Sequence, residues 1–242
     1  AVLKVLRTPS HGESPEALFP VLRVRHPSVV EAFRAGRGPD GLPFVLMAYL
    51  QGETLRDRLA REGPFEPARA IDLATDLAEG LSALHRAGIV HGSLGAEAAF
   101  LVRTPGRHGR LSARLLDFPP ASPIRTRADD PVSFPGSPVG PETDLHALGD
   151  LLYEAVTGVA PWHARQTDLP ARRLVPMPLT LQCPGRQVPP DFDDLVTRLV
   201  LPLAGSGTLS GLGPLTGTKV GVVEVGGMIT DSGEVIQQLK RF

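Results

Sequence analysis

The glycines between Gly205 and Gly217, followed by Thr218 and Lys219, have the composition of a loop that could bind phosphate. A Walker-type loop needs the order G-x-x-x-x-G-K-[ST], with a strand before it and a helix after it. Here the threonine precedes the lysine, and the residues that follow favour a strand. The composition therefore favours a flexible Gly/Ser/Thr linker, which we assign to residues 201–218.

Lysine and cysteine, whose side chains often take part in catalysis or metal binding, are scarce. Only three of the 25 Lys and Arg residues are lysines, and Lys4 is the only one in the first two hundred residues. A coding bias toward arginine explains the scarcity, and it makes Lys4 informative. Cys183 is the only cysteine, which excludes a disulfide framework and a cysteine zinc cluster. Five scattered histidines lack metal-ligand spacing: His11, His85, His108, His146 and His163.

The overall charge and hydropathy exclude several classes of partner. The 25 basic and 26 acidic residues give a net charge of -1, which predicts no binding of nucleic acid. The apolar stretches are far shorter than the ~20 residues that span a bilayer. The start has no secretion signal, so we expect a cytoplasmic protein. It also has no initiator methionine, so we expect the sequence to begin inside a longer coding sequence.

Strands are predicted in the first fifty residues and helices after them. Residues 1–6 and 43–49 are apolar runs that favour strands, and a hairpin turn is expected over 36–42. Leucines and alanines between 70 and 84 recur at helical spacing. Pro67 suits the first turn of that helix, and Gly88 suits a left-handed terminator.

Three further helices are expected toward the end of the chain. One covers about 144–157, with Thr143 or Asp144 as its cap and Gly158 at its end. A shorter one covers 192–200. In the tail, we expect a strand over 220–229 and a helix over 234–242 whose capping box begins at Asp231.

Six segments occur in an order typical of one enzyme family. In chain order they are AVLK (1–4), HPSVV (26–30), FVLMAYLQGET (44–54), the approach LSALHRAGIV (81–90) with the loop HGSLGAEA (91–98), DFP (117–119), and TDLHALG–LYE–TG (143–158). Over residues 1–200 the pattern resembles the eukaryotic-type serine/threonine protein kinases found in bacteria. The resemblance implies a two-lobe α+β fold. An N-terminally truncated small lobe would cover residues 1–50, and a mainly helical large lobe would cover 51–200.

The resemblance also implies a nucleotide site. Lys4 would hold the phosphates of ATP and Asp117 would hold magnesium. The alternatives without a functional role are a solvated lysine on a strand and an aspartate in a turn. Met47 would stand at the gatekeeper position, next to Ala48 and Tyr49 in the hinge that lines the nucleotide.

Two further residues would shape the catalytic loop. His91 is expected to be a packed structural histidine. Asp144 is expected to accept hydrogen bonds, at ~2.7–3.2 Å, from backbone N–H groups near residues 91–93.

The loop at 91–98 departs from the family pattern H-R-D-L-K-P-E-N. Ser93 stands at the position of the catalytic base, Gly95 at that of the lysine and Ala98 at that of the asparagine. A serine hydroxyl is no carboxylate base near neutral pH, and an alanine offers no oxygen to a metal. Glu97 could replace the base, but a solvated loop glutamate is the favoured interpretation.

The small lobe departs from the pattern as well. The family's glycine-rich loop would precede the strand that carries Lys4, and this sequence begins at that strand. The glutamate that would pair with Lys4 is ambiguous, because Glu13 and Glu16 are both candidates. Pro119 replaces the glycine of D-F-G and fixes the backbone where the family has freedom.

The tail has a second, shorter resemblance. KVGVVEVGGMITDS (219–232) and the helix after it are similar to the opening strand–helix unit of signal peptide peptidases, which are serine/lysine enzymes. The similarity stops before any nucleophile, so residues 219–242 are interpreted as an orphan strand–helix unit.

These patterns predict a pseudokinase, with weak or no binding of ATP and magnesium, that binds an unidentified protein partner. Two alternatives remain. One is an active serine/threonine kinase. The other is a fragment of a larger fusion with a signal peptide peptidase.

Overall fold

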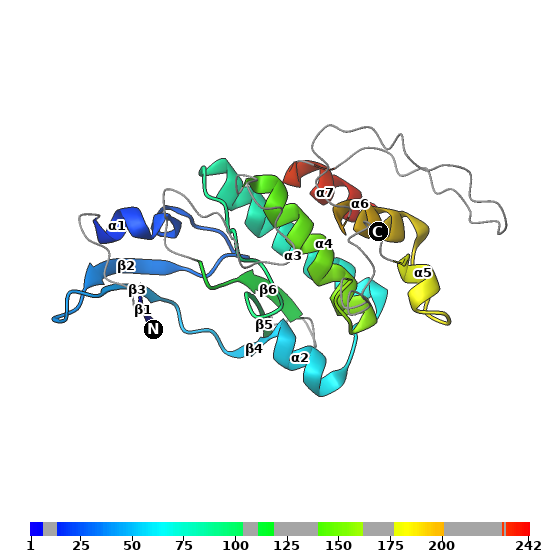
Figure 1. Cartoon of the computed structure of the whole chain (residues 1–242), viewed down its shortest axis with the longest axis horizontal. Helices are drawn as coiled ribbons and strands as arrows, with labels where there is room; N and C mark the ends of the chain where they lie inside the picture. Colours follow the sequence, from blue (N-terminus) through cyan, green and yellow to red (C-terminus); the bar gives the residue numbers. More distant parts are fainter. Residues whose placement is uncertain (7–13, 104–110, 119–139, 162–176, 201–228, 230) are drawn as a thin grey trace, which may run out of the picture.

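The structure is a computed structural model that describes residues 1–6, 14–103, 111–118, 140–161, 177–200, 229 and 231–242. A small part built around a sheet precedes a larger helical part, which is the two-lobe α+β arrangement expected from the sequence (Figure 1).

The small lobe is a three-stranded antiparallel sheet with one short helix and a 3-10 turn packed beside it. The strand order is β1-β3-β2, and Lys4 pairs with Val45 of β3. A hairpin joins β2 to β3, and Gly41 supplies its positive φ of 77°. The elements are β1 (Val2–Val5), α1 (Pro15–Leu18), η1 (Pro20–Arg23), β2 (Ala32–Arg37) and β3 (Pro43–Met47).

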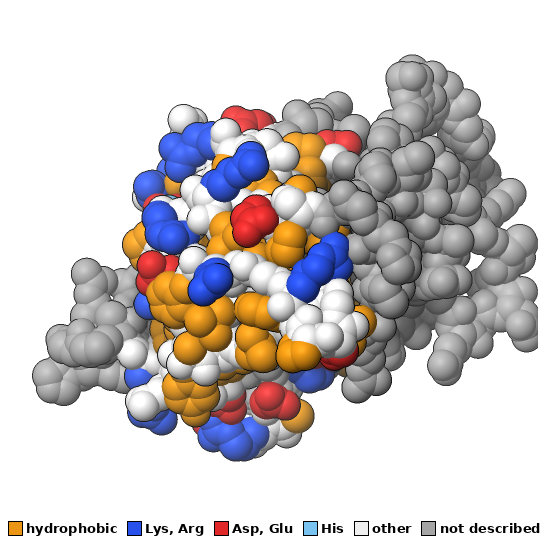
Figure 2. All heavy atoms as spheres, turned by 90° about the vertical axis from the view of Figure 1, so that its left-hand side faces the viewer, with side chains coloured by type: hydrophobic (Ala, Val, Ile, Leu, Met, Phe, Trp, Pro, Cys, Tyr) orange, Lys and Arg blue, Asp and Glu red, His pale blue; other side chains and the backbone are white. Residues whose placement is uncertain are grey.

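The outer face of this sheet is apolar and exposed. Leu3 and Val5 of β1 are 54% and 45% exposed. In β2, a shift in the pairing register between Ala32 and Arg34 marks a bulge at Phe33, which is 48% exposed. Figure 2 shows the small-lobe end of the molecule, where apolar side chains gather among Lys and Arg side chains.

The large lobe contains a second sheet of three strands, in the order β4-β5-β6, and most of the helices. Its elements are β4 (Gly52–Thr54), α2 (Leu55–Glu62), α3 (Pro67–Arg86), β5 (Ala99–Arg103), β6 (Leu111–Leu115), α4 (Pro141–Thr157), α5 (Leu179–Gln182), α6 (Pro190–Val200) and α7 (Ser232–Leu239).

Helix α3 is the centre of the large lobe and follows the predicted spacing. Its apolar face is buried, with Leu77, Leu81 and Leu84 at most 1% exposed. Pro67 occupies the first turn, and Gly88 has a φ of 71° just after the end. The predicted start and stop signals are confirmed.

Helix α4 begins earlier than predicted. Pro141 fits the first turn, where its missing N–H leaves no bond unmade, so the helix starts there and Gly140 is the N-cap. The predicted caps were therefore wrong: the Thr143 hydroxyl accepts a bond from the Gly140 N–H (3.2 Å), and Asp144 lies inside the first turn. Gly158 ends the helix in the left-handed region, as predicted.

The helix predicted at 192–200 starts at Pro190. The predicted linker at 201–218 and all but the last residue of the predicted strand at 220–229 lie outside the described residues. The tail helix is present as α7, where Asp231 caps it through the Gly233 N–H (3.1 Å). Where we expected an orphan unit, α7 packs against α3 and α6 (Figure 1). No helix among the described residues has the length and apolarity needed to cross a membrane.

Candidate functional site

The loop at 91–98 runs from the end of α3 to the start of β5, and Asp144 of α4 holds its first residues. The Asp144 carboxylate accepts the backbone N–H of His91 at 2.8 Å and that of Gly92 at 2.7 Å. The expected contact between Asp144 and this loop is confirmed. The Nε2 atom of His85 lies 2.8 Å from the same carboxylate, which is 1% exposed. Three groups of the α3 end and the loop therefore converge on one buried charge.

His91 is fully buried and connects the loop to the segment after β6. Its Nε2 atom lies 2.8 Å from the carbonyl oxygen of Leu116, and its Nδ1 atom accepts the N–H of Ser93 at 3.4 Å. The proton is therefore on Nε2, and the imidazole is neutral. Burial lowers the pKa of His91, against the opposing charge of Asp144. The ring packs on Phe118 with centroids 5.0 Å apart, as expected of a structural histidine.

Lys4 and Asp117 meet although 113 residues separate them. The Lys4 ammonium donates to the Asp117 carboxylate and, at 3.0 Å, to the carbonyl oxygen of Phe118. Asp117 has a φ of 59° and is the only described non-glycine residue with a positive φ. Aspartate tolerates this conformation better than most residues, and such backbone geometry clusters at functional sites. The two residues expected to bind ATP and magnesium form one ion pair between the lobes.

Of the two glutamates predicted as possible partners of Lys4, the structure describes only Glu16. Glu16 of α1 is exposed, and the Lys4 ammonium contacts Asp117 instead. Glu13 and Pro119 lie outside the described residues.

The three hinge residues differ in exposure. Met47 ends β3 and is 9% exposed, so its side chain belongs to the core. Ala48 donates its backbone N–H to the carbonyl oxygen of Glu31 at 2.8 Å. Tyr49 is 66% exposed. A nucleotide-lining role for these residues stays a prediction.

The departures from the family pattern occur in a loop whose main chain is hydrogen-bonded to its surroundings. Ser93 is half-buried, and its backbone N–H is bonded to the His91 ring. Ala98 is 3% exposed, and its carbonyl oxygen accepts the N–H of Leu116 at 2.8 Å. Neither side chain offers a carboxylate. Glu97 is 79% exposed, which fits the interpretation as a solvated glutamate.

An arginine that the sequence did not single out links this loop to two helices. The Arg56 backbone N–H, in α2, donates to the carbonyl oxygen of Ala96 at 3.0 Å. Its guanidinium lies 3.6 Å from Glu97 and also contacts Glu154 of α4. His85 was also not predicted as a partner of Asp144. Its position shortly before the loop at 91–98 could have indicated that it lies near Asp144.

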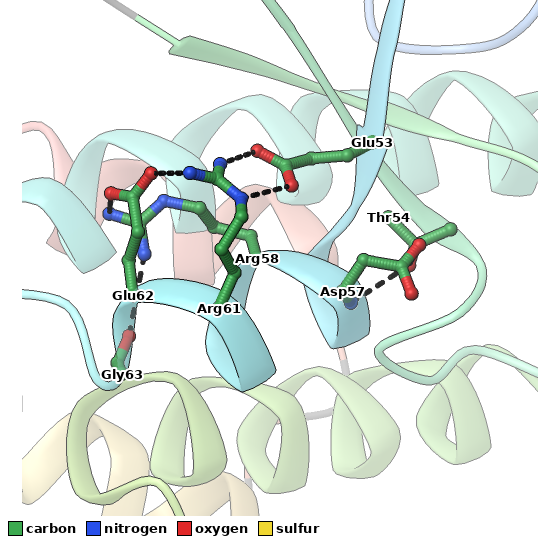
Figure 3. A network of polar contacts seen from close by, with 7 residues as sticks. All are labelled: Glu53, Thr54, Asp57, Arg58, Arg61, Glu62 and Gly63. Atoms are coloured by element: carbon green, nitrogen blue, oxygen red, sulfur yellow. Dashed lines mark hydrogen bonds and ion pairs between the residues drawn. The ribbon is translucent and has the colours of Figure 1, made fainter.

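A polar network at the ends of α2 connects this helix to Glu53 of β4 and to the turn after the helix (Figure 3). Arg61 contacts Glu53 and Glu62, and the hydrogen bond with Glu53 raises the pKa of Arg61. Arg58 pairs with Glu62, and its guanidinium lies 4.7 Å from the Phe65 ring centre. Several linked partners hold α2 where isolated surface pairs would contribute little.

The described side chains near Lys4 and Asp117 offer few oxygen ligands for the magnesium of Mg·ATP. No cluster of three His, Cys, Asp or Glu among the described residues could hold a metal ion. Asp117 offers one carboxylate, which Lys4 already neutralises, and Ala98 offers no oxygen. Because magnesium prefers several oxygen ligands, no reaction step through the metal can be derived from these residues.

The comparisons with known proteins agree with this geometry. The protein kinase domain model matches residues 18–200. Serine/threonine-protein kinase pkn3 of Myxococcus xanthus is 29% identical over 223 residues, covering 81% of this chain and 40% of the relative. Pkn2 of the same organism is 33% identical over 180 residues, covering 63% and 21%. PknB of Mycobacterium tuberculosis H37Rv is 29% identical over 157 residues, covering 57% and 24%.

Fold and site thus define a protein-kinase-like domain. The chain belongs to the protein kinase domain family, and the relatives it matches are bacterial serine/threonine kinases. It spans 40% or less of the length of each of these three relatives.

Proposed function

We propose that this chain is a pseudokinase: a kinase-family domain that binds a protein partner without transferring phosphate. The observation that carries the proposal is Ser93 at the position of the catalytic base. Kinase chemistry uses a carboxylate to accept the proton of the acceptor hydroxyl. General base catalysis contributes roughly 10²–10⁴-fold to such rates, and a serine hydroxyl supplies none of it. Ala98 removes a metal ligand in addition.

The ion pair between the lobes supports weak or absent nucleotide binding. Lys4 is bonded to Asp117 and to the Phe118 carbonyl, so ATP phosphates must compete for an ammonium that already has partners. We expect Mg·ATP to bind more weakly than millimolar, or not at all.

A binding role has support in the exposed apolar face of the small lobe. Leu3, Val5 and Phe33 are each about half exposed on its two outer strands. Clustered exposed apolar side chains are typical of protein interaction sites. The partner is expected to be a protein, and a cytoplasmic location stays a prediction.

An active serine/threonine kinase is the second candidate. The contact between Lys4 and Asp117 favours it, because the two residues assigned to nucleotide and magnesium lie together. The fusion with a signal peptide peptidase rests on residues 219–232, most of which lie outside the described residues, and stays a prediction.

A phosphoryl-transfer assay separates the two candidates. Purified chain is incubated with labelled ATP, magnesium or manganese, and generic protein acceptors. We expect no transfer above a heat-inactivated sample. Transfer by the unmodified chain that disappears in both Lys4→Ala and Asp117→Ala would establish the active kinase and refute the pseudokinase.

A further inference from the structure

The face of the large lobe formed by α3 and α6 is covered by a segment from outside the recognised family region. The protein kinase domain match ends at residue 200, whereas α7 (Ser232–Leu239) packs against both helices. Figure 1 shows α7 lying next to α6 and α3 on one side of the lobe.

The covering segment contributes apolar side chains to the common core. Val235 and Leu239, one turn apart on α7, are 0% and 2% exposed. Ile229, before the helix, is 3% exposed. Phe242 meets the buried Phe192 of α6 edge to face, with ring centroids 6.0 Å apart. Burial at i and i+4 is the pattern of a helix docked on one face.

Charged groups fix both ends of the segment. At the end of α7, the Lys240 ammonium lies 3.2 Å from the Glu79 carboxylate of α3. Near its start, the Glu234 carboxylate lies 3.6 Å from the guanidinium of Arg198, which also donates to the side-chain oxygen of Gln238.

Arg198 needs these partners. Its side chain is 13% exposed, and its other ion-pair partner is Asp194 of the same helix. A largely buried guanidinium is costly unless several acceptors surround it. Two of its acceptors, the side chains of Glu234 and Gln238, come from α7, so α6 carries a charge that would lose these partners without the C-terminal segment.

We infer that residue 229 and residues 231–242 are an integral part of the large lobe and the specific occupant of the α3–α6 face. The folded unit therefore extends beyond residue 200 and includes α7. The inference is independent of the proposed function, because it holds whether or not the domain transfers phosphate.

A matched pair of substitutions in the full chain tests the docking. Val235→Asp places a carboxylate in the interface, whereas Gln237→Asp places the same group on the exposed side of the same helix. We expect Val235→Asp to lower the thermal midpoint of the lobe by about 5 °C or more, and Gln237→Asp by about 1 °C. Hydrogen exchange in α3, around Glu79, should accelerate only in Val235→Asp. Equal midpoints and equal exchange in the two variants would overturn the inference.

An engineered cut covers the case in which Val235→Asp does not fold. A protease site inserted after Gly213 allows the chain to be cleaved after folding. We expect the fragment that contains α7 to elute together with the lobe in size-exclusion chromatography. If the fragment separates while the lobe keeps its midpoint and its exchange pattern, α7 is an appendage and the inference is wrong.

Discussion

Removing the Asp144 carboxylate should destabilise the large lobe well beyond the loss of an ordinary helix cap. Asp144 lies in the first turn of α4, but its bonds go to the backbone N–H groups of His91 and Gly92 and to the ring of His85. Asp144→Ala leaves the buried N–H of His91 and the half-buried N–H of Gly92 without this acceptor.

The magnitude follows from the two backbone bonds. A hydrogen bond to a charged group contributes about 1.5–3 kcal/mol, so two such bonds give about 3–6 kcal/mol. Relief of the buried charge offsets part of this loss, because Asp144 is 1% exposed. We therefore expect a net loss of about 3 kcal/mol, equivalent to a fall in Tm of roughly 6–12 °C for a domain of this size.

The assay is urea and thermal unfolding of Asp144→Ala beside Glu142→Ala. Glu142 lies in the same helical turn and favours the helix N-terminus by about 0.3–1 kcal/mol only. Hydrogen exchange of the loop at 91–98 should accelerate in Asp144→Ala and stay unchanged in Glu142→Ala. If the two variants lose the same stability, the carboxylate does not hold the loop and our reasoning is refuted.

Three further predictions concern protonation, ligand binding and packing. Burial lowers the pKa of His91, so on acidification the histidine of the unfolded chain takes up a proton before that of the folded chain. The free energy of unfolding should therefore fall as the pH drops below about 6.5, the ordinary pKa of histidine. The urea midpoints at pH 7.5 and pH 5.5 should differ less in His91→Gln than in the unmodified chain. Millimolar Mg·ATP should stabilise the chain by only a few tenths of a kcal/mol, and a thermal shift of several degrees that Lys4→Ala abolishes would contradict this. Gly149→Ala should lower the thermal midpoint markedly, because a Cβ would lie 2.6 Å from the Cβ of Leu199, whereas Ala147→Gly, in the same helix, should cost only about 1 kcal/mol.

The elements that the sequence predicted well are those set by local spacing. Leu77, Leu81 and Leu84 repeat every three to four residues, and a buried helical face is the direct consequence. The register of the recognised motifs also gave one tertiary contact, that of Asp144 with the loop. That contact links residues more than fifty apart, and only the order of motifs made it predictable.

The contacts that escaped prediction depend on long-range packing. Arg56 has an ordinary place in a helix, and nothing in its neighbours indicates that Glu154 lies beside it. The start of α4 was misplaced because Pro141 reads equally well as a loop residue or as a first-turn proline. The packing of α7 against α3 and α6 was not predicted, because a Gly/Ser/Thr-rich stretch separates α7 from α6 in the sequence. The composition of that stretch does not indicate which helices the segment after it contacts.

The hydrogen bonds that hold the loop at 91–98 do not use the side chains at positions 93 and 98, on which the proposed pseudokinase function rests. Asp144 holds the loop through the backbone N–H groups of residues 91 and 92, and the carbonyl oxygen of Ala98 holds Leu116. These bonds use main-chain atoms, which every non-proline residue possesses, so they do not depend on the side chains at 93 and 98. In the proposed pseudokinase, Ser93 stands at the position of the base, while the bonds from the loop to Asp144 of α4 and to the N–H of Leu116 involve only its main chain. Under this proposal, the stability of the loop rests on main-chain atoms, whereas the missing base and metal ligand are side-chain groups.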